Sequence, residues 1–326
     1  MDQDIRQFGT LSDGRRVDAI TLRAGAAQAT VLTWGAVLQD MRLAGVGHSL
    51  TLGSDRLADY EGAMRHHGSL IGPVVNRLSG AKAVVQGREL RFEANHEGRI
   101  TLHSGAAGTH LKRWDVAAAG ADFVLLGLQL ADGEGGFPGR RSVAARFTLA
   151  APATLRLEVT AVTDAVTLLN FANHSYWNLD GGPDWSGHQV RVAAERYLRT
   201  TVDFTPTGEI SKVEGAAVDF RQMTGIAPGR PALDTCFCLA EARRELTDVV
   251  WLRGRSGVHM VVATTEPGVQ VYDGRAARRP GRGAYEGIAV EAQGWPDAPN
   301  HAGFPSIAVQ PGETCRQVTE WRFGSG

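Results

Sequence analysis

The 326-residue sequence contains little that would mark a secreted or membrane-spanning protein. It has three cysteines, an odd number, and Cys236 and Cys238 are spaced neither as a disulfide framework nor as a zinc site. No apolar run approaches the roughly 20 residues that cross a membrane. Residues 1–6 are polar and acidic, whereas a signal peptide opens with basic and then apolar residues. We therefore expect reduced, partly buried thiols, no membrane partner and a cytoplasmic location.

An excess of charge of one sign is also absent, because 34 basic residues face 35 acidic ones, for a formal net charge of -1. No overall field draws such a chain to nucleic acid, so a neutral small molecule is the better-matched partner. Hydrophobic residues make up 43% of the chain and charged residues 21%, which is typical of a protein with a large core. Length alone leaves one or two domains open.

Helical periodicity is scarce, and alternation with a period of two dominates. In residues 154–160 the apolar side chains share one face and the polar ones the other, which predicts a half-buried antiparallel strand. The same alternation recurs, between clusters of Gly, Pro, Asp and Asn, at 189–192, 257–262, 268–272 and 307–310. Residues 55–60 and 241–246 are candidates for short helical turns, although both also fit surface loop.

Repeats, low-complexity tracts and composition shifts that would mark a domain boundary are missing. The sequence therefore predicts an all-β fold over residues 1–326, as a single large antiparallel β-sandwich of two packed sheets.

A carboxylate interrupts the apolar pattern of residues 287–296. Glu291 shares a strand face with Ala289 and Gln293, which predicts an open or concave surface. Taken alone, it matches the commoner case of a solvated strand glutamate. The amide of Gln293 and the possible aromatic platform of Trp295 favour a ligand site instead.

Residues 170–179 gather amides, a histidine, a hydroxyl and two large aromatics within ten positions. His174 shares its face with Ala172 and Tyr176, which leaves room for a ligand. A single histidine is more often structural than catalytic, so this cluster alone leaves both roles of His174 open. Further polar residues in apolar settings, each better explained by itself as structural, are Asn76, Arg77, His103, Asp234 and Gln270.

Together these motifs closely resemble, in order and spacing, the galactose mutarotase family, the aldose 1-epimerases. The motifs are Asn76-Arg77, Leu102-His103, residues 173–179, Leu233-Asp234, residues 268–270 and residues 290–297. The likeness runs from about Leu11 to Phe323. It implies a single-domain β-supersandwich with a monosaccharide in an open cleft, no metal or organic cofactor, and a monomer or homodimer.

Carried over residue by residue, the resemblance implies that Glu291 is the general base and His174 the general acid. The sugar-hydroxyl ligands that it implies are Asn76, Arg77, His103, Asp234 and Gln270. Two positions depart from the family pattern: its usual Gly-Arg is Gly72-Pro73 here, and its usual His-Gly-Gly is His103-Ser104-Gly105. These departures bear on substrate preference more than on reaction type.

Interconversion of anomers requires removal of a proton from the C1 hydroxyl and protonation of the ring oxygen, so one base and one acid suffice. A histidine titrates near working pH, as an acid–base catalyst should. Glutamate titrates near about 4.3, so we expect Glu291 to be ionised at neutral pH, with a partly apolar cleft raising its basicity.

Three other functions compete with this one. A metal site could be formed by His103, His174 and Glu291, although no metal-binding signature joins them. A non-catalytic sugar-binding module would need neither the acid nor the base. A hexose-6-phosphate 1-epimerase would need extra cationic groups in its cleft, for which Arg77 alone is weak support.

Overall fold

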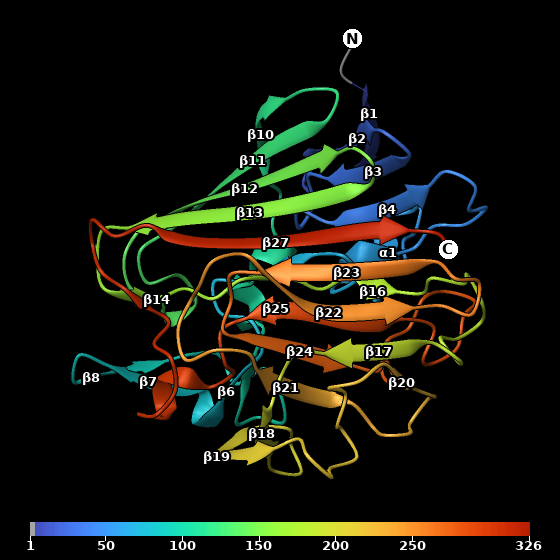
Figure 1. Ribbon diagram of the computed structural model, residues 1–326. Coiled ribbons are helices and arrows are strands. Elements are labelled where there is room, and N and C mark those ends of the chain that lie inside the picture. Colours follow the sequence, from blue (N-terminus) through green and yellow to red (C-terminus); the bar gives the residue numbers. More distant parts are fainter. Residues whose placement is uncertain (1–3) are drawn as a thin grey trace.

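The computed structural model describes residues 4–326 and is built almost entirely from antiparallel strands (Figure 1). Met1 to Gln3, the start of the polar N-terminal segment, lie outside the described residues. The all-β prediction is confirmed. Within residues 4–326, no helix has the length and apolar character needed to cross a membrane.

The largest sheet has nine strands and extends across the molecule in Figure 1. In spatial order its strands are β10 (Asp115–Ala119), β11 (Phe123–Leu130), β12 (Arg141–Ala150), β13 (Thr154–Thr163), β27 (Cys315–Gly324), β23 (His259–Thr264), β22 (Thr247–Arg253), β17 (Gln189–Val192) and β20 (Thr224–Gly225). The C-terminal strand β27 lies between β13 and β23, so it joins the two halves of this sheet.

A six-stranded sheet carries the residues of greatest interest. Its strands, in spatial order, are β16 (Tyr176–Trp177), β25 (Ile288–Gln293), β24 (Gly268–Tyr272), β21 (Asp234–Cys238), β18 (Arg196–Thr200) and β19 (Pro206–Lys212). A four-stranded sheet at the N-terminal end is formed by β1 (Asp4–Thr10), β2 (Arg16–Ala24), β3 (Ala27–Leu32) and β4 (Leu38–Leu43).

Short elements connect these sheets. The two-stranded pairs are β5 (Leu70–Ile71) with β15 (Ala172–Asn173), β6 (Arg77–Leu78) with β9 (Thr101–Leu102), β7 (Lys82–Val85) with β8 (Arg88–Arg91), and β14 (Thr167–Leu168) with β26 (Ala308–Val309). The helical segments are α1 (Leu57–Glu61) and the 3-10 turns η1 (Ser79–Ala81), η2 (Gly105–Ala107), η3 (Thr109–Leu111), η4 (Glu134–Gly136) and η5 (Ala298–Asn300).

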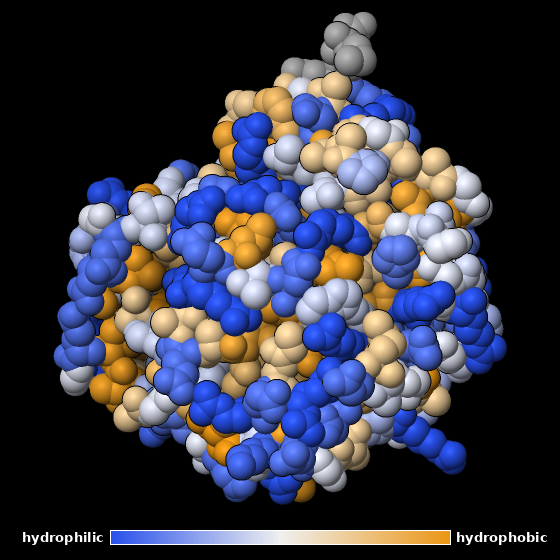
Figure 2. All heavy atoms as spheres, in the orientation of Figure 1, coloured by the Kyte–Doolittle hydropathy of each residue, from blue (hydrophilic) through white to orange (hydrophobic). Residues whose placement is uncertain are grey.

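The period-two alternation determines which side chains of each strand are buried in the core. In β13, Leu155 and Leu157 point inward and are buried, whereas Arg156 and Glu158 face outward. There Arg156 pairs with Glu320, and Arg316 pairs with Glu158. Figure 2 accordingly shows a mostly hydrophilic surface on this side.

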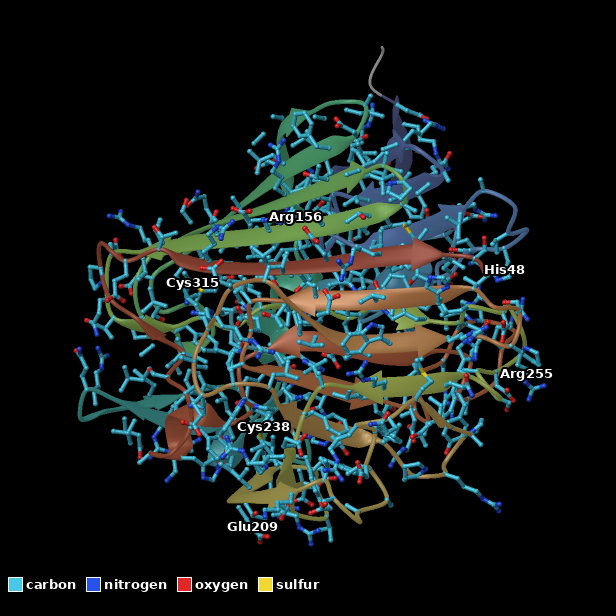
Figure 3. All side chains as sticks on the ribbon, in the orientation of Figure 1. His48, Arg156, Glu209, Cys238, Arg255 and Cys315 are labelled. Carbon is cyan, nitrogen blue, oxygen red and sulfur yellow. The ribbon has the colours of Figure 1, made fainter. Side chains whose placement is uncertain are left out.

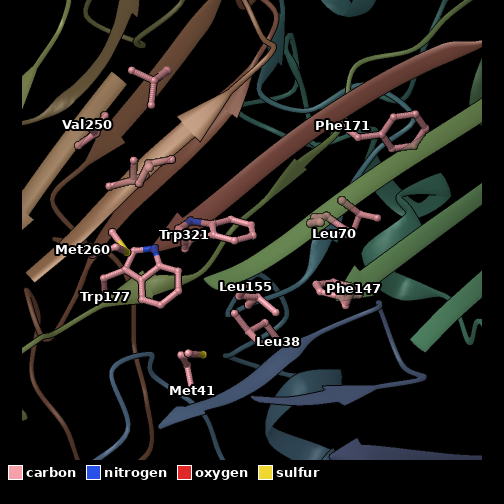
Figure 4. Packing of buried hydrophobic residues seen from close by; sticks show 14 of the residues in the cluster. Leu38, Met41, Leu70, Phe147, Leu155, Phe171, Trp177, Val250, Met260 and Trp321 are labelled. Atoms are coloured by element: carbon pink, nitrogen blue, oxygen red, sulfur yellow. The ribbon is translucent and has the colours of Figure 1, made fainter. Parts of the chain in front are cut away.

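The inward side chains of all three sheets form one continuous apolar cluster (Figure 4). It includes Leu38 from β4, Leu155 from β13, and Trp177 from β16. The ring centroids of Trp177 and Trp321 lie 6.0 Å apart within this cluster. The core thus lies between the nine-stranded sheet and the two smaller sheets, and it supports the six-stranded sheet from one side only.

Most predicted elements are present. The alternating segments at 154–160, 189–192 and 268–272 lie in β13, β17 and β24. Residues 257–262 overlap β23, and residues 307–310 contain only the two-residue strand β26. The candidate turn at 55–60 overlaps α1, whereas 241–246 forms no helix because it is a loop of bends.

The thiol prediction is also confirmed. All three cysteines are free and buried. Cys238 and Cys315 lie in different parts of the molecule (Figure 3).

Candidate active site

A cavity of about 410 Å³ opens on the face of the six-stranded sheet that the core does not cover. Strand pairing places four residues in one row across the floor of the cavity. Tyr176 pairs with Ala289, Ala289 pairs with Tyr272, and Tyr272 pairs with Asp234. Directly paired residues of antiparallel strands point to the same face. Glu291, two residues along β25, therefore points to this face as well, and it lines the cavity.

His174 reaches the cavity from the short segment between β15 and β16. Its backbone is held on both sides, since its N–H donates to the carbonyl of Ser69 at 2.9 Å and its carbonyl accepts from Gly68 N–H at 3.0 Å. Gly68 has a φ of +71°, and a Cβ there would lie 2.2 Å from the Leu38 carbonyl oxygen. Only glycine fits this position, so the segment that holds His174 is tightly specified.

Glu291 and His174 meet at the base of the cavity, where His174 Nε2 lies 3.5 Å from Glu291 Oε1. Both side chains are almost fully enclosed, with residue exposures of 2% for Glu291 and 4% for His174. Oε2 of Glu291 and Nδ1 of His174 have no hydrogen-bond partner among the described residues. A buried carboxyl and a buried imidazole thus face each other, and each has one atom that could still form a hydrogen bond.

Burial shifts both groups away from their usual titration. It raises the pKa of Glu291 to about 8, with the negative charge of Asp234 adding to the rise and Arg77 opposing it. It lowers the pKa of His174 to about 4. Loss of water penalises the charged form of each group, which explains the opposite directions.

The expectation that Glu291 is ionised at neutral pH is therefore wrong for this environment. With its pKa at about 8, the carboxyl holds a proton at pH 7, while His174 is neutral. The sequence suggested a partly apolar cleft, but the enclosure of Glu291 is nearly complete. Between about pH 4 and pH 8 the two residues together hold one proton.

Arg77 and Asp234 form an ion pair at the cavity wall, with Nη2 of Arg77 3.1 Å from Oδ2 of Asp234. The other oxygen of Asp234 accepts a hydrogen bond of 2.5 Å from the side-chain amide of Gln270. Arg77 and Asp234 line the cavity, whereas Gln270 is buried behind Asp234 and does not line it. Gln270 thus reaches the site through Asp234.

Asn76 and His103 are joined by two hydrogen bonds, one to the ring and one between backbones. His103 Nδ1 accepts from the backbone N–H of Asn76 at 3.1 Å, and the Asn76 carbonyl accepts from His103 N–H at 3.0 Å. Burial, together with the charges of nearby His66 and His174, lowers the pKa of His103 well below its usual value. The neutral ring therefore carries its proton on Nε2 and presents a hydrogen-bond donor there.

The two departures from the family pattern lie behind the cavity wall. Ser104 is buried, and its hydroxyl bonds the Val74 N–H and the Val74 carbonyl, each at 2.9 Å. Its φ is +62°, a conformation that glycine adopts without strain, so these two bonds compensate for the side chain. Pro73 precedes Val74, and neither Pro73 nor Ser104 lines the cavity.

The rest of the lining includes residues that sequence patterns did not single out. Phe204, from the loop before β19, lies with its ring centroid 5.4 Å from the Arg77 guanidinium carbon and 5.5 Å from that of Arg275. An isolated loop phenylalanine gives no sequence signal. Tyr272 lies on the same face of β24 as Gln270, so the alternation of this strand could have predicted that Tyr272 lies near the site.

Two adjacent histidines, His66 and His67, also line the cavity. The chain has only ten histidines, so two in succession could have indicated a functional segment. The ring of His67 packs against Tyr176 at 4.5 Å.

Gln293 and Trp295 do not form the predicted polar and aromatic surroundings of the sugar. Gln293 is fully buried and its amide donates to the Gly294 carbonyl at 3.1 Å. Trp295 packs against Phe304 at 5.1 Å and donates from its indole to the Pro267 carbonyl at 2.9 Å. Strand β25 ends at Gln293, so the chain turns Trp295 away from the cavity and into a core cluster.

His103 and His174 are neighbours, with ring centroids 5.4 Å apart, and Glu291 lies beside His174. Within residues 4–326, however, no group of three or more His, Cys, Asp or Glu side chains is arranged to hold a metal ion.

A second, polar hollow of about 560 Å³ lies over the four-stranded sheet and the loops near His48. It contains none of the predicted site residues.

Comparison with known proteins identifies the family of the chain. Residues 18–322 match the profile of the family described as aldose 1-epimerase. The chain is 31% identical to galactose mutarotase of Rattus norvegicus, with 97% of each chain covered. It is 28% identical to aldose 1-epimerase of Escherichia coli strain K12, over 95% of this chain and 96% of the relative.

Solved structures share the fold. A galactose 1-epimerase from Lactobacillus acidophilus NCFM superposes with a TM-score of 0.86 at 23% identity, covering 100% of this chain and 99% of the other. An aldose epimerase homologue from C. elegans also has a TM-score of 0.86 and 23% identity, covering 94% of this chain and 98% of the other. The predicted mutarotase-like fold class is therefore confirmed.

Ser104 provides a test of the wall behind the cavity. Ser104→Ala removes the partner of the buried Val74 N–H and keeps a Cβ at positive φ, so we expect a loss of about 1–3 kcal/mol in the free energy of unfolding. Ser104→Gly loses the same bonds but relieves the backbone, and we expect a loss smaller by about 1 kcal/mol. Urea unfolding measures both. Ser142→Ala, on the outer side of β12, is the control, and a Ser104→Ala variant as stable as that control would contradict this assignment.

Proposed function

The chain belongs to the aldose 1-epimerase family, and we propose that Glu291 and His174 are the base and the acid with which it opens and recloses the ring of a free aldose. The activity is that of an isomerase which interconverts the α and β anomers of an aldose. The observation that supports these roles is the enclosed contact of 3.5 Å between His174 Nε2 and Glu291 Oε1 at the base of the cavity.

In the proposed reaction, the Glu291 carboxylate removes the proton from the C1 hydroxyl. The electron pair left on O1 forms the C1–O1 double bond, the C1–O5 bond breaks, and O5 takes a proton from the His174 imidazolium. The open-chain aldehyde rotates about C1–C2 and closes on its other face, with the two residues exchanging roles. No atom or electron is lost, so the pair returns to its starting state.

This sequence needs a single proton on the pair, which is the number that burial imposes across neutral pH. At pH 7 that proton resides on Glu291. Its transfer to His174 as the sugar binds generates the carboxylate and imidazolium that the first step uses. The proton count stays the same, so no exchange with solvent is required.

Substrate hydroxyls are held, in this proposal, by Asn76, Arg77, His103 and Asp234, all of which line the cavity. Gln270 acts by fixing Asp234, to which it donates a hydrogen bond. Charge-assisted hydrogen bonds from a fixed ion pair orient the sugar while C1 remains free to rotate.

A free aldose fits this cavity better than a sugar phosphate. The two arginines of the lining are already paired, Arg77 with Asp234 and Arg275 with Asp273. The lining also carries the acidic residues Glu97 and Asp203, which both pair with Arg99. A phosphate would need cations that are not already neutralised.

We further propose that residues 11–323 act as one domain, that the chain is a monomer or homodimer, and that it works in the cytoplasm without a metal or organic cofactor. The domain proposal rests on the continuous cluster that joins all three large sheets.

The first test removes each partner of the pair. Glu291→Gln keeps the volume and removes the base, whereas His174→Asn removes the acid and keeps a polar side chain. We expect each to lower kcat about 100- to 10,000-fold with the fold intact. Polarimetry of a pure α-sugar, with spontaneous mutarotation subtracted, measures the rate. His48→Asn, beside the second hollow, is the matched control. Near-wild-type rates in either catalytic variant would refute the assignment.

A second test follows from the two pKa values. Above about pH 8 Glu291 loses the proton of the pair, and below about pH 4 His174 gains a second one, so we expect kcat/KM to be level between these limits and to fall beyond both. Rates measured at each pH against buffer alone test this. A profile that falls between pH 5 and pH 7, or stays level well above pH 9, would contradict the one-proton pair.

A further inference from the structure

His66 is a cavity residue to which neither the sequence patterns nor the proposed reaction gives a role. It lies in the turn between α1 and β5. Its ring stacks on His174, with centroids 5.7 Å apart and an angle of 26° between the planes. The His103 ring lies 4.9 Å away and the His110 ring 5.1 Å away. Contacts with three other imidazoles therefore fix the orientation of this side chain.

The hydrogen-bonding capacity of His66 is unused. No side chain or backbone group in the described part of the chain forms a hydrogen bond with its ring, and its nitrogens are not sealed off by protein atoms as Nδ1 of His110 and His174 are. Burial, followed by the charges of His110 and His174, lowers the pKa of His66 well below its usual value. A neutral imidazole has one donor and one acceptor, which matches a sugar hydroxyl.

The reaction geometry indicates which hydroxyl this is. In the proposed function, O1 lies at Glu291 and O5 lies at His174. Glu291 meets the Nε2 edge of His174, whereas His66 packs on the face of the same ring. The sugar atom that follows O5, away from C1, is C5, so the substituent of C5 lies close to His174 and to the cavity residues that pack on its ring. Among these, His66 is the imidazole to which the proposed reaction gives no role.

We propose that His66 binds the exocyclic C6 hydroxyl of an aldohexose and so determines the preference of the site for hexoses. This inference rests on the proposed function, because it uses the positions of O1 and O5 given there. A site that pairs a polar side chain with one sugar hydroxyl discriminates against a sugar that lacks this hydroxyl.

The test compares sugars that differ only in this hydroxyl: D-galactose with 6-deoxy-D-galactose, and D-glucose with 6-deoxy-D-glucose. For the wild type we expect kcat/KM to be about three- to tenfold higher for the hexose, as one hydrogen bond provides. His66→Phe keeps the packing against His174 and His103 but lacks the nitrogens, so the ratio should fall to about one. His66→Leu provides a second variant without nitrogens and should give the same ratio.

Two controls separate binding from structure. His110→Phe changes the same cluster from a position that does not line the cavity, so the ratio should stay at its wild-type value. His66→Gln keeps a donor and an acceptor and should retain part of the ratio.

An active His66→Phe variant that keeps the wild-type ratio would overturn the proposal, and so would an equal fall in kcat/KM for the hexose and its 6-deoxy analogue. Failure of the proposed function is a different result, namely turnover that persists in Glu291→Gln.

Discussion

The enclosure of one carboxyl group beside one imidazole is the constraint on which the chemistry of this protein depends. Glu291 and His174 lie 3.5 Å apart with exposures of only 2% and 4%, so the charge of each group depends on the charge of the other. Loss of water raises the pKa of Glu291 and lowers that of His174. The pair is thereby poised to hold a single proton, which ring opening moves but does not consume.

The surrounding fold serves this enclosure. Three large sheets form one core, and the six-stranded sheet turns its uncovered face toward the cavity. Backbone conformations with positive φ occur where the site needs sharp turns, at Asn76, His103 and Ser104. Such conformations persist only where neighbouring contacts hold them, as the bonds between Ser104 and Val74 do. The rigid wall that results fixes Arg77 and His103 in the cavity.

Local periodicity in the sequence predicts many of the strands and the face of Glu291, because alternation is a property of neighbouring residues. The near-complete burial of Glu291 was not predictable, since the residues that share its cavity, such as His174 and Arg77, come from segments far away in the sequence. Trp295 was misplaced because the sequence does not show that β25 ends at Gln293. His66 was missed since it lies in a turn, where alternation gives no information.

The most direct test is to measure whether the shared proton lies on Glu291 at neutral pH. Infrared difference spectra between the wild type and Glu291→Gln, recorded from pH 6 to pH 10, report the carbonyl band of the protonated Glu291 carboxyl. We predict that this band is present at pH 7 and disappears as the pH rises through about 8. A carboxylate signal already complete at pH 6 would contradict the account, because Glu291 would then not hold the proton that its burial assigns to it at neutral pH.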